Sequence, residues 1–253
     1  MIRGMRLLCN RSVLAAGALA VAMLAHDTAG LGAQATEDRP TLRVPAVEDF
    51  AVNGRGDHPN WQPVPWTGLG ARGGAADAPL TRMKVAWSAR GLYVLMDGAD
   101  RRLTASFEED FSDLWKEDVF EAFVWPDERD TLYFEYEISP LGRELPILIP
   151  NLDERFLGWR PWHYGGTRRV QHAASVTGGP QQTGATITGW RGEFMIPHAL
   201  LSPLRNVPPT KGSRWRANFY RVDYDGGTSV SWAWARVGKS FHEFKSFGTL
   251  VFE

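Results

Sequence analysis

The stretch that decides the fold is Val119-Phe120-Glu121-Ala122-Phe123-Val124-Trp125, followed after residues 126–130 by Thr131-Leu132-Tyr133-Phe134-Glu135-Tyr136-Glu137-Ile138. Successive side chains of a β-strand point to opposite faces. Alternation therefore places Phe120, Ala122 and Val124 in one apolar row, which we expect to face the core, and Glu121 on the other side. Two such runs separated by a short turn predict a β-hairpin.

The second run of the hairpin repeats the pattern of the first. Phe134, Tyr136 and Ile138 share one face, and the opposite face carries Tyr133, Glu135 and Glu137. Some registers of the hairpin place Glu121 opposite Glu135, although the sequence does not select one. Facing carboxylates repel, so such a cluster would need an arginine, a metal ion or a shared proton. A solvated acidic face is the other interpretation of Glu135 and Glu137.

The rest of the chain has the same short β-type runs and no long helical period, which predicts an all-β protein. About nine strands indicate a β-sandwich of the jelly-roll or immunoglobulin-like kind. We expect residues 36–80 to be an extended lead-in or edge strand, and residues 139–184 to be an irregular loop carrying Trp159, Trp162, His163 and Tyr164. The expected strands are Met83–Trp87, Leu92–Met96, Val119–Trp125, Thr131–Ile138, Ala185–Trp190, Gly192–Ile196, Trp215–Val222, Val230–Trp234 and Thr249–Phe252.

The amino terminus has the pattern of an export signal. Arg3 and Arg6 precede an apolar run at 13–25, and Ala33-Gln34-Ala35 supplies a small-x-small cleavage site. The run is too short to span a bilayer. We therefore expect a signal peptide at 1–35, a single domain at 36–253, and a secreted or periplasmic protein with no integral membrane segment after cleavage.

Composition narrows the function classes. The 253 residues contain 28 Lys and Arg against 29 Asp and Glu, and this balance offers no broad attraction to nucleic acid. The single cysteine, Cys9, excludes a disulfide framework. Eleven tryptophans are unusual, and aromatic surface either builds a core or lines a binding face.

Trp115 lies just before Glu121, and this pairing of residue types suits a sugar. The apolar C–H face of a pyranose packs on an aromatic ring, while carboxylates accept hydrogen bonds from its hydroxyls. Similar ingredients recur late in the chain, at 216–221 with Asn218 and Arg221, and at Ser231-Trp232-Ala233-Trp234. Trp232 and Trp234 have the same parity, so both rings should emerge on one face of their strand.

Five motifs in order resemble the family 9 carbohydrate-binding modules and their relatives, over nearly the whole chain after the signal peptide. They are Leu114-Trp115-Lys116-Glu117-Asp118-Val119-Phe120-Glu121, Gly189-Trp190-Arg191-Gly192-Glu193-Phe194-Met195-Ile196-Pro197, Trp215-Arg216-Ala217-Asn218-Phe219-Tyr220-Arg221, Ser231-Trp232-Ala233-Trp234, and Phe241-His242-Glu243-Phe244-Lys245-Ser246-Phe247-Gly248. The resemblance implies a noncatalytic module that clamps a saccharide between two tryptophans, accessory to extracellular polysaccharide degradation or uptake.

When the family's site residues are matched to this sequence, the resemblance implies that Trp115 and Trp234 form the clamp. Trp232 is the alternative to Trp234 in this role. The resemblance implies Glu121 as the hydroxyl acceptor, and Asn218 and Arg221 as further contacts. The chain departs from the family pattern at Glu135 and Glu137, where sugar-binding members tend to carry basic or amide groups, so the polar half of the pocket is expected to be altered.

Structural calcium is also seen in this family, and no other cofactor is implied. The acidic residues Glu108, Glu109, Asp110 and Asp113 offer oxygen ligands, although their spacing matches no calcium loop. A solvated charged loop is the other interpretation of this segment.

Two alternative functions remain open at this point. Glycoside hydrolysis would need an acid and a nucleophile or base, which Glu121 with Glu135, or Glu117 with Asp118, could supply. A haem-binding electron-transfer domain of the related superfamily would need axial ligands. The candidates for these ligands are Met83, Met96, Met195, His163, His198 and His242.

Overall fold

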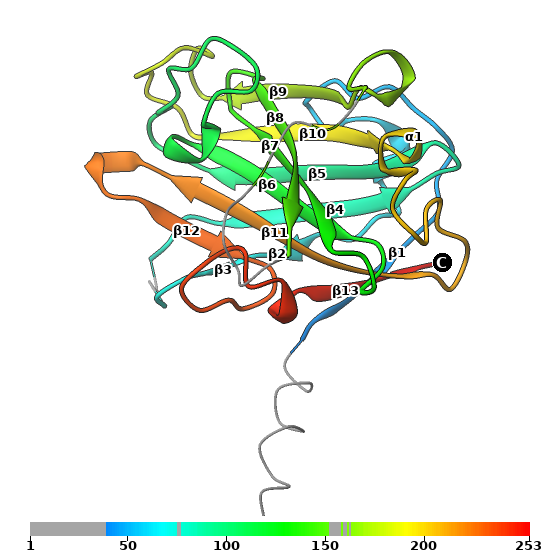
Figure 1. Cartoon of the computed structure of the whole chain (residues 1–253). Coiled ribbons are helices and arrows are strands. Elements are labelled where there is room, and N and C mark those ends of the chain that lie inside the picture. Colours follow the sequence, from blue (N-terminus) through cyan, green and yellow to red (C-terminus); the bar gives the residue numbers. More distant parts are fainter. Residues whose placement is uncertain (1–38, 75–76, 152–157, 159–160, 162) are drawn as a thin grey trace, which may run out of the picture. The chain divides into compact units, whose positions relative to one another are not determined.

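The computed structural model describes residues 39–74, 77–151, 158, 161 and 163–253 (Figure 1). The predicted signal peptide, Trp159 and Trp162 lie outside these residues. The part from Asp38 onward forms one compact unit. Strands make up most of the regular secondary structure of the described residues, as the sequence predicts.

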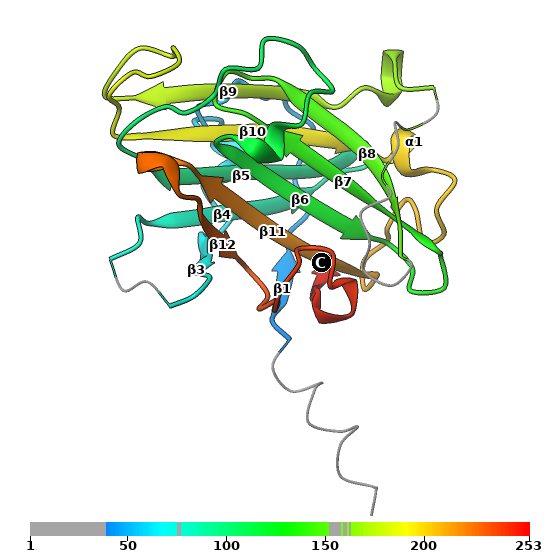
Figure 2. The ribbon, with the colours of Figure 1, turned by 60° about the vertical axis from the view of Figure 1, so that its left-hand side comes forward.

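The strands form two sheets that face each other (Figure 2). The larger sheet has the order β1-β13-β11-β6-β7-β8, with β12 and β3 continuing beside β11, and the smaller sheet has the order β2-β4-β5-β10-β9. The larger sheet comprises β1 (Thr41–Val44), β3 (Gly70–Ala71), β6 (Val119–Trp125), β7 (Leu132–Ile138), β8 (Glu144–Pro150), β11 (Arg214–Asp223), β12 (Val230–Ala233) and β13 (Gly248–Phe252). The smaller sheet comprises β2 (Thr67–Gly68), β4 (Thr81–Trp87), β5 (Gly91–Ala99), β9 (Gln171–Thr177) and β10 (Gly189–Pro197).

Helical structure among the described residues is confined to short turns. The α-helix α1 has four residues, and the 3-10 turns have three residues each. These elements are α1 (His198–Leu201), η1 (Pro59–Trp61), η2 (Leu114–Lys116), η3 (Gly166–Arg168), η4 (Asp225–Gly227) and η5 (Phe244–Ser246).

The main core lies between the two sheets. Phe120, Ala122 and Val124 of β6 are fully buried there, which confirms the face that their alternation predicts. Phe120 stacks on Trp190 of β10 with ring centroids 3.8 Å apart, so an aromatic contact joins the two layers.

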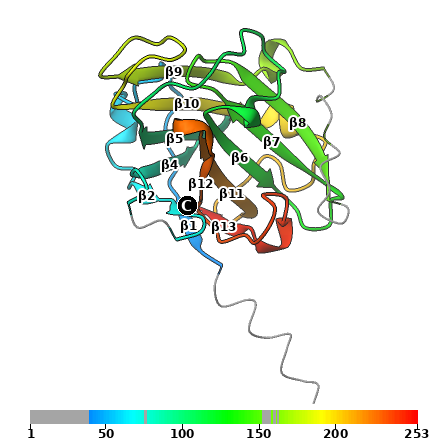
Figure 3. The same cartoon turned by 90° about the vertical axis from the view of Figure 1, so that its left-hand side faces the viewer.

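The outer face of the larger sheet is covered as well. The chain that follows β12 folds back over this face before it enters β13 (Figure 3). Phe244 and Phe247 of this returning chain pack with Phe123 and Tyr133 in a second apolar cluster. Strands β6 and β7 are therefore buried on both faces, whereas a half-solvated sheet would expose one of them.

Two sequence expectations about secondary structure were wrong, whereas the edge strands expected in the lead-in 36–80 are present as β1 and β2. Residues 139–184 contain β8 and β9, and the runs expected at 185–190 and 192–196 belong to the single strand β10. The lead-in 36–80 contributes β1, β2, β3 and η1. Strands β8 and β9 are edge strands, and an edge strand tolerates proline such as Pro146 because one row of its N–H groups needs no partner.

Arg221 of β11 joins the two sheets. Its guanidinium Nη1 donates to the carbonyl of Ala99 in the smaller sheet at 2.7 Å, and Nη2 donates to Asp223 at 2.7 Å and to Asp100 at 3.1 Å. Gly98 makes room for this approach, since a Cβ there would lie 2.8 Å from Nη1. The side chain is fully buried, so its charge depends on these partners.

Arg221→Met should therefore lower the free energy of unfolding by about 3–5 kcal/mol, because two buried carboxylates lose their cation. Arg43→Met is the matched control: the Arg43–Glu253 ion pair is exposed at 78% and 41%, and its loss should change stability by less than about 1 kcal/mol. Urea unfolding of the two variants measures both values. Equal losses would show that Arg221 does not hold the sheets.

Candidate functional site

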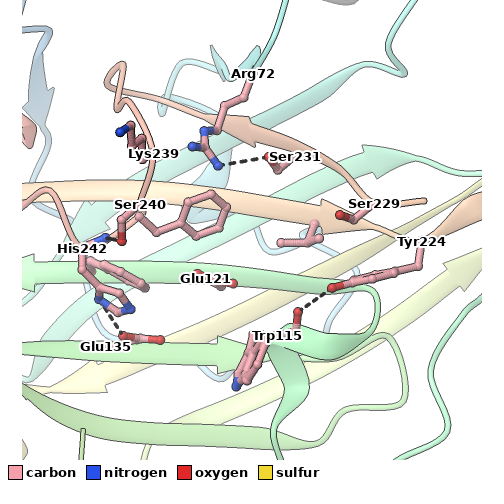
Figure 4. Close-up of a pocket in the computed structure, with 13 residues that line it drawn as sticks. Arg72, Trp115, Glu121, Glu135, Tyr224, Ser229, Ser231, Lys239, Ser240 and His242 are labelled. Atoms are coloured by element: carbon pink, nitrogen blue, oxygen red, sulfur yellow. Dashed lines mark hydrogen bonds and ion pairs between the residues drawn. The ribbon is translucent and has the colours of Figure 1, made fainter. Parts of the chain in front are cut away.

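A pocket of about 490 Å³ opens on the outer face of the larger sheet, over β6, β7 and β11. We call it the Trp115 pocket. Figure 4 shows Arg72, His242, Trp115 and Tyr224 around its edge, with Glu121 between them. The side chains come from segments far apart in the sequence, and the covered outer face brings them together.

Trp115 presents its ring to solvent at one edge of the pocket. Its residue is 43% exposed, and Leu80 is the other large apolar residue exposed in the described part of the chain. Leu114, the first residue of η2, is buried in the second apolar cluster and anchors the turn. The Tyr224 hydroxyl donates to the Trp115 carbonyl at 3.0 Å. Trp115 is thus an exposed ring on a fixed backbone.

The returning chain supplies a second aromatic edge. The Phe241 ring stacks on Tyr220 with centroids 4.1 Å apart and planes 5° apart, and His242 stacks on Phe123 at 5.4 Å. The Arg72 guanidinium lies over the Phe241 ring, 4.8 Å from its centroid. Phe241 and Trp115 both line the pocket, so aromatic surface borders it on two segments.

Buried carboxyl groups lie beneath the pocket. Glu121 and Glu135 line it while being only 2% and 3% exposed, and Glu137 beside them is fully buried. The hairpin register pairs Glu121 with Glu137 and Phe123 with Glu135. This differs from the register that would place Glu121 opposite Glu135. The solvated interpretation of Glu135 and Glu137 is wrong, because both residues are buried.

Burial raises the pKa of all three carboxyl groups well above the usual range. The negative charge of Glu137 raises the pKa of Glu121 further, and Arg72 opposes this only in part. Glu121 raises the pKa of Glu135, and Glu135 raises that of Glu137. The raised pKa favours the protonated form of each group, which can donate as well as accept hydrogen bonds.

His242 does not supply a positive charge to this cluster at neutral pH. Burial lowers its pKa to about 4, so the imidazole is neutral. Its Nδ1 lies 2.6 Å from the Tyr133 hydroxyl and 3.9 Å from Glu135 Oε2. The ring therefore contributes shape and hydrogen bonding to the pocket.

Two of the six residues predicted as saccharide contacts, Trp115 and Glu121, lie together in the Trp115 pocket. Trp232 and Trp234 do share a face, as their parity predicts, but both pack against the core between the sheets. Ser231, with the opposite parity, lines the pocket instead. Trp234 borders a neighbouring cavity of about 600 Å³, to which Arg72 also contributes. The predicted clamp of Trp115 with Trp234 is therefore not one pocket.

Asn218 and Arg221 have structural partners. The Asn218 amide donates to the Tyr220 hydroxyl at 2.7 Å and to the Ala235 carbonyl at 3.0 Å, which ties the returning chain to β11. Arg221 bridges the sheets, with its guanidinium 4.6 Å from the centroid of the Trp232 ring. Both residues are fully buried and neither lines the Trp115 pocket.

Sequence reasoning missed Arg72, Tyr224, Lys239 and Phe241 as pocket residues. Arg72 lies among glycines and Lys239 in a turn, and neither carries a local signal. Phe241 and His242 belong to a quoted motif, and an aromatic next to a histidine was the available signal. Their relation to Trp115 depends on the returning chain, which no local pattern reveals.

The residues considered for calcium do not form a calcium site. Asp110 pairs with Arg169, and Asp113 pairs with Lys116. In the described ranges, the acidic groups that approach closely enough to share an ion are Asp100, Asp118 and Asp223.

The Arg221 guanidinium already contacts Asp100 and Asp223. Asp118 accepts the backbone N–H groups of Thr104 and Tyr224, at 2.6 and 2.9 Å. The set of three carboxylates therefore does not fit a structural calcium ion. Burial raises the pKa of Asp100 to about 6 and that of Asp118 to about 8.

The residues of the two alternative functions are placed as follows. Met83 and Met96 are fully buried between the sheets, and the His198 ring contacts the Ser88 carbonyl. None of these lines the Trp115 pocket with His242. Met195 is buried in a third cluster, and His163 is exposed. Among the acids named for hydrolysis, Glu117 accepts the backbone N–H groups of Ser106 and Phe107.

Comparisons with known proteins agree on the fold. A crystal structure described as a "putative carbohydrate-binding protein" from Bacteroides uniformis superposes with a TM-score of 0.69, at 21% identity, over 85% of this chain and 100% of that one. A family 9 carbohydrate-binding module from Caldicellulosiruptor kristjanssonii gives 0.60 in complex with cellotriose and 0.61 with glucose, at 15% and 14% identity. Each match covers 84% of this chain, and 94% and 95% of the module respectively.

A protein of Arthroderma benhamiae named "Extracellular protein" is 27% identical over 186 residues, which are 69% of this chain and 79% of that protein. No family model matches the chain. The chain thus has the fold of the family 9 carbohydrate-binding modules, as the motifs predict. Within the residues that the structure describes, no helix is long and apolar enough to cross a bilayer.

The buried acids predict that stability falls as pH rises. A carboxyl whose folded pKa is raised holds its proton more tightly when folded, so its stabilisation is complete below the unfolded pKa and is lost as pH rises through the folded pKa. Glu121, Glu135 and Glu137 act in this direction, as do Asp100 and Asp118.

Glu137→Gln should flatten the decline above about pH 4.5, because an amide does not ionise. Urea unfolding across this range measures the slope. Glu48→Gln, which removes an exposed carboxylate, is the control and should leave the slope unchanged. An unaltered slope in Glu137→Gln would contradict the burial of an ionisable group there.

Proposed function

We propose that this chain is an exported, noncatalytic carbohydrate-binding protein that holds a saccharide in the Trp115 pocket. The observation that carries the proposal is the pairing of an exposed tryptophan with buried carboxyl groups in one pocket. Aromatic surface and a few convergent polar groups are what a sugar site requires. The module of like fold from C. kristjanssonii, in complexes with cellotriose and glucose, supports this ligand class.

Each part of the pocket has a task in binding. The Trp115 ring packs against the C–H face of a pyranose, and the returning chain with Phe241 and His242 borders the same ligand. Glu121 and Glu135 exchange hydrogen bonds with ring substituents, in a setting where few waters compete. The fixed backbone of Trp115 limits the entropy lost on binding.

The proposal also covers the location of the protein and its biological role. The amino-terminal pattern supports export, and the A. benhamiae relative is named as extracellular. A protein outside the cytoplasm that binds sugar suits an accessory part in polysaccharide degradation or uptake. Arg72 lines both the Trp115 pocket and the neighbouring cavity that Trp234 borders. A longer saccharide that extends past Arg72 from the pocket into this cavity would contact Trp234.

Trp115→Ala should weaken saccharide binding by about 2 kcal/mol or more while leaving the fold intact, because the ring is an exposed anchor. Calorimetric titration of the exported chain with mono- and oligosaccharides measures the affinity. Trp66→Ala is the matched control, since Trp66 is half-buried outside the pocket, with its ring against Arg82.

Trp232→Ala should instead lower the free energy of unfolding by about 3–5 kcal/mol, since Trp232 is a core residue. Trp234→Ala should weaken binding of oligosaccharides but not of a monosaccharide. Equal sugar affinity in Trp115→Ala and the parent chain would refute the proposed site.

A further inference from the structure

We propose that the saccharide of the Trp115 pocket is an amino sugar, whose ammonium group is held by the carboxyl groups of Glu121 and Glu135. This inference rests on the proposed function, and it names the ligand chemistry of the same pocket. It stands on the placement of three glutamates, on an oxygen that lacks a donor, and on the partners of the nearby cations.

The three glutamates project from neighbouring positions of β6 and β7 toward the outer face. Glu121 and Glu137 are directly paired in the register, and Glu135 lies two residues along the same strand face. Glu121 and Glu135 reach the pocket. A buried row of three acids is unusual, because each one disfavours ionisation of the others.

One carboxyl oxygen at the pocket lacks a donor from the protein side. Apart from the adjacent Glu137 carboxyl, Glu135 Oε2 has no hydrogen-bond partner in the described part of the chain, although it is buried and lines the pocket. Buried carboxyl oxygens normally have partners, so a ligand donor is the missing one.

The charged groups around the cluster are engaged elsewhere or face solvent. Arg72 donates to the Gly238 carbonyl at 2.6 Å and lies over the Phe241 ring. Lys239 is exposed at the rim. His242 is neutral near pH 7, because burial lowers its pKa to about 4. On the side of η2, Asp113 is paired with Lys116.

Among common sugar substituents, an ammonium group fits such a floor best. It carries three N–H donors and a positive charge, and charge-assisted hydrogen bonds to carboxylates are about twice as strong as neutral ones. A hydroxyl lacks the charge, and an acetamide adds bulk and an acceptor. A metal ion is a poorer candidate, because the acidic groups close enough to share an ion in the described ranges lie at the Arg221 network.

Binding of the ammonium group is coupled to release of protons. Burial and mutual repulsion raise the pKa of these acids in the free pocket, and a bound cation favours their ionised forms. Affinity for the amino sugar should therefore rise with pH until the ligand amine loses its own proton. The pocket would bind an amino sugar and expel a proton in one step.

The test compares three disaccharides that differ at carbon 2: cellobiose, its diamino counterpart made of two glucosamine units, and the N,N′-diacetylated form of the latter. Calorimetric titration of the exported chain near pH 7.5, in two buffers of different ionisation enthalpy, reports both affinity and proton release. We expect the diamino sugar to bind about tenfold or more tightly than cellobiose. Its binding enthalpy should depend on the buffer.

Glu135→Gln and Glu121→Gln test the assignment to these side chains. Each should reduce the ratio of diamino sugar to cellobiose affinity toward one and diminish the proton release. Glu48→Gln is the matched control, since it removes an exposed carboxylate outside the pocket and should preserve the ratio. A circular dichroism melt of each variant reports whether it is folded.

The outcomes separate the two proposals. Cellobiose binding that equals or exceeds that of the diamino sugar, and that Trp115→Ala abolishes, would overturn the amino-sugar inference and sustain the carbohydrate site. No binding of any of the three sugars would overturn the proposed function itself. Methylammonium that binds as tightly as the diamino sugar would show a cation site and overturn both.

Discussion

The buried network around Arg221 is the constraint on which the site depends. Arg221 joins the sheets through Ala99, Asp100 and Asp223. Asp118, within reach of these carboxylates, accepts the backbone N–H of Tyr224, whose hydroxyl in turn donates to the carbonyl of Trp115. The carboxylates held by the arginine between the sheets thus lie beside the aspartate that fixes Tyr224, and Tyr224 fixes the backbone of Trp115. The same arginine occupies the position where the acids converge, through its contacts with Asp100 and Asp223.

The second constraint is the cover on the outer face of the larger sheet. The chain after β12 packs Phe241, Phe244 and Phe247 over this face and is tied to β11 by Asn218. This cover turns an acidic strand face into a pocket floor. Burial is normally avoided for glutamate, and here it raises the pKa of these groups and so favours their uncharged forms. The polar floor of the pocket therefore depends on the packing of the chain after β12 over this face.

Alternation along β6 predicted the core face of the hairpin, and the order of motifs predicted the sandwich, because both depend on local pattern. Strands β8 and β9 escaped prediction since edge strands tolerate proline and polar residues. The tryptophans show the same limit. Alternation of side chains along the strand correctly placed Trp232 and Trp234 on one face. Which face packs against the core depends on the position of the other sheet, and the sequence of the strand does not show this. Arg72 and Phe241 reach the pocket through contacts between segments more than 160 residues apart, and such contacts leave no trace in a local window.

The parallel pairing of β1 with β13 has a mechanical consequence. Thr41 pairs with Thr249 and Val44 with Phe252, so the two strands at the ends of the described fold run side by side in the same direction. A pull on the start of β1 and the end of β13 acts along the strands in opposite senses. Their hydrogen bonds would then bear the force together, in shear, whereas an antiparallel pair pulled from its adjacent ends opens one bond at a time. A fold built in this way resists tension between these two strand ends.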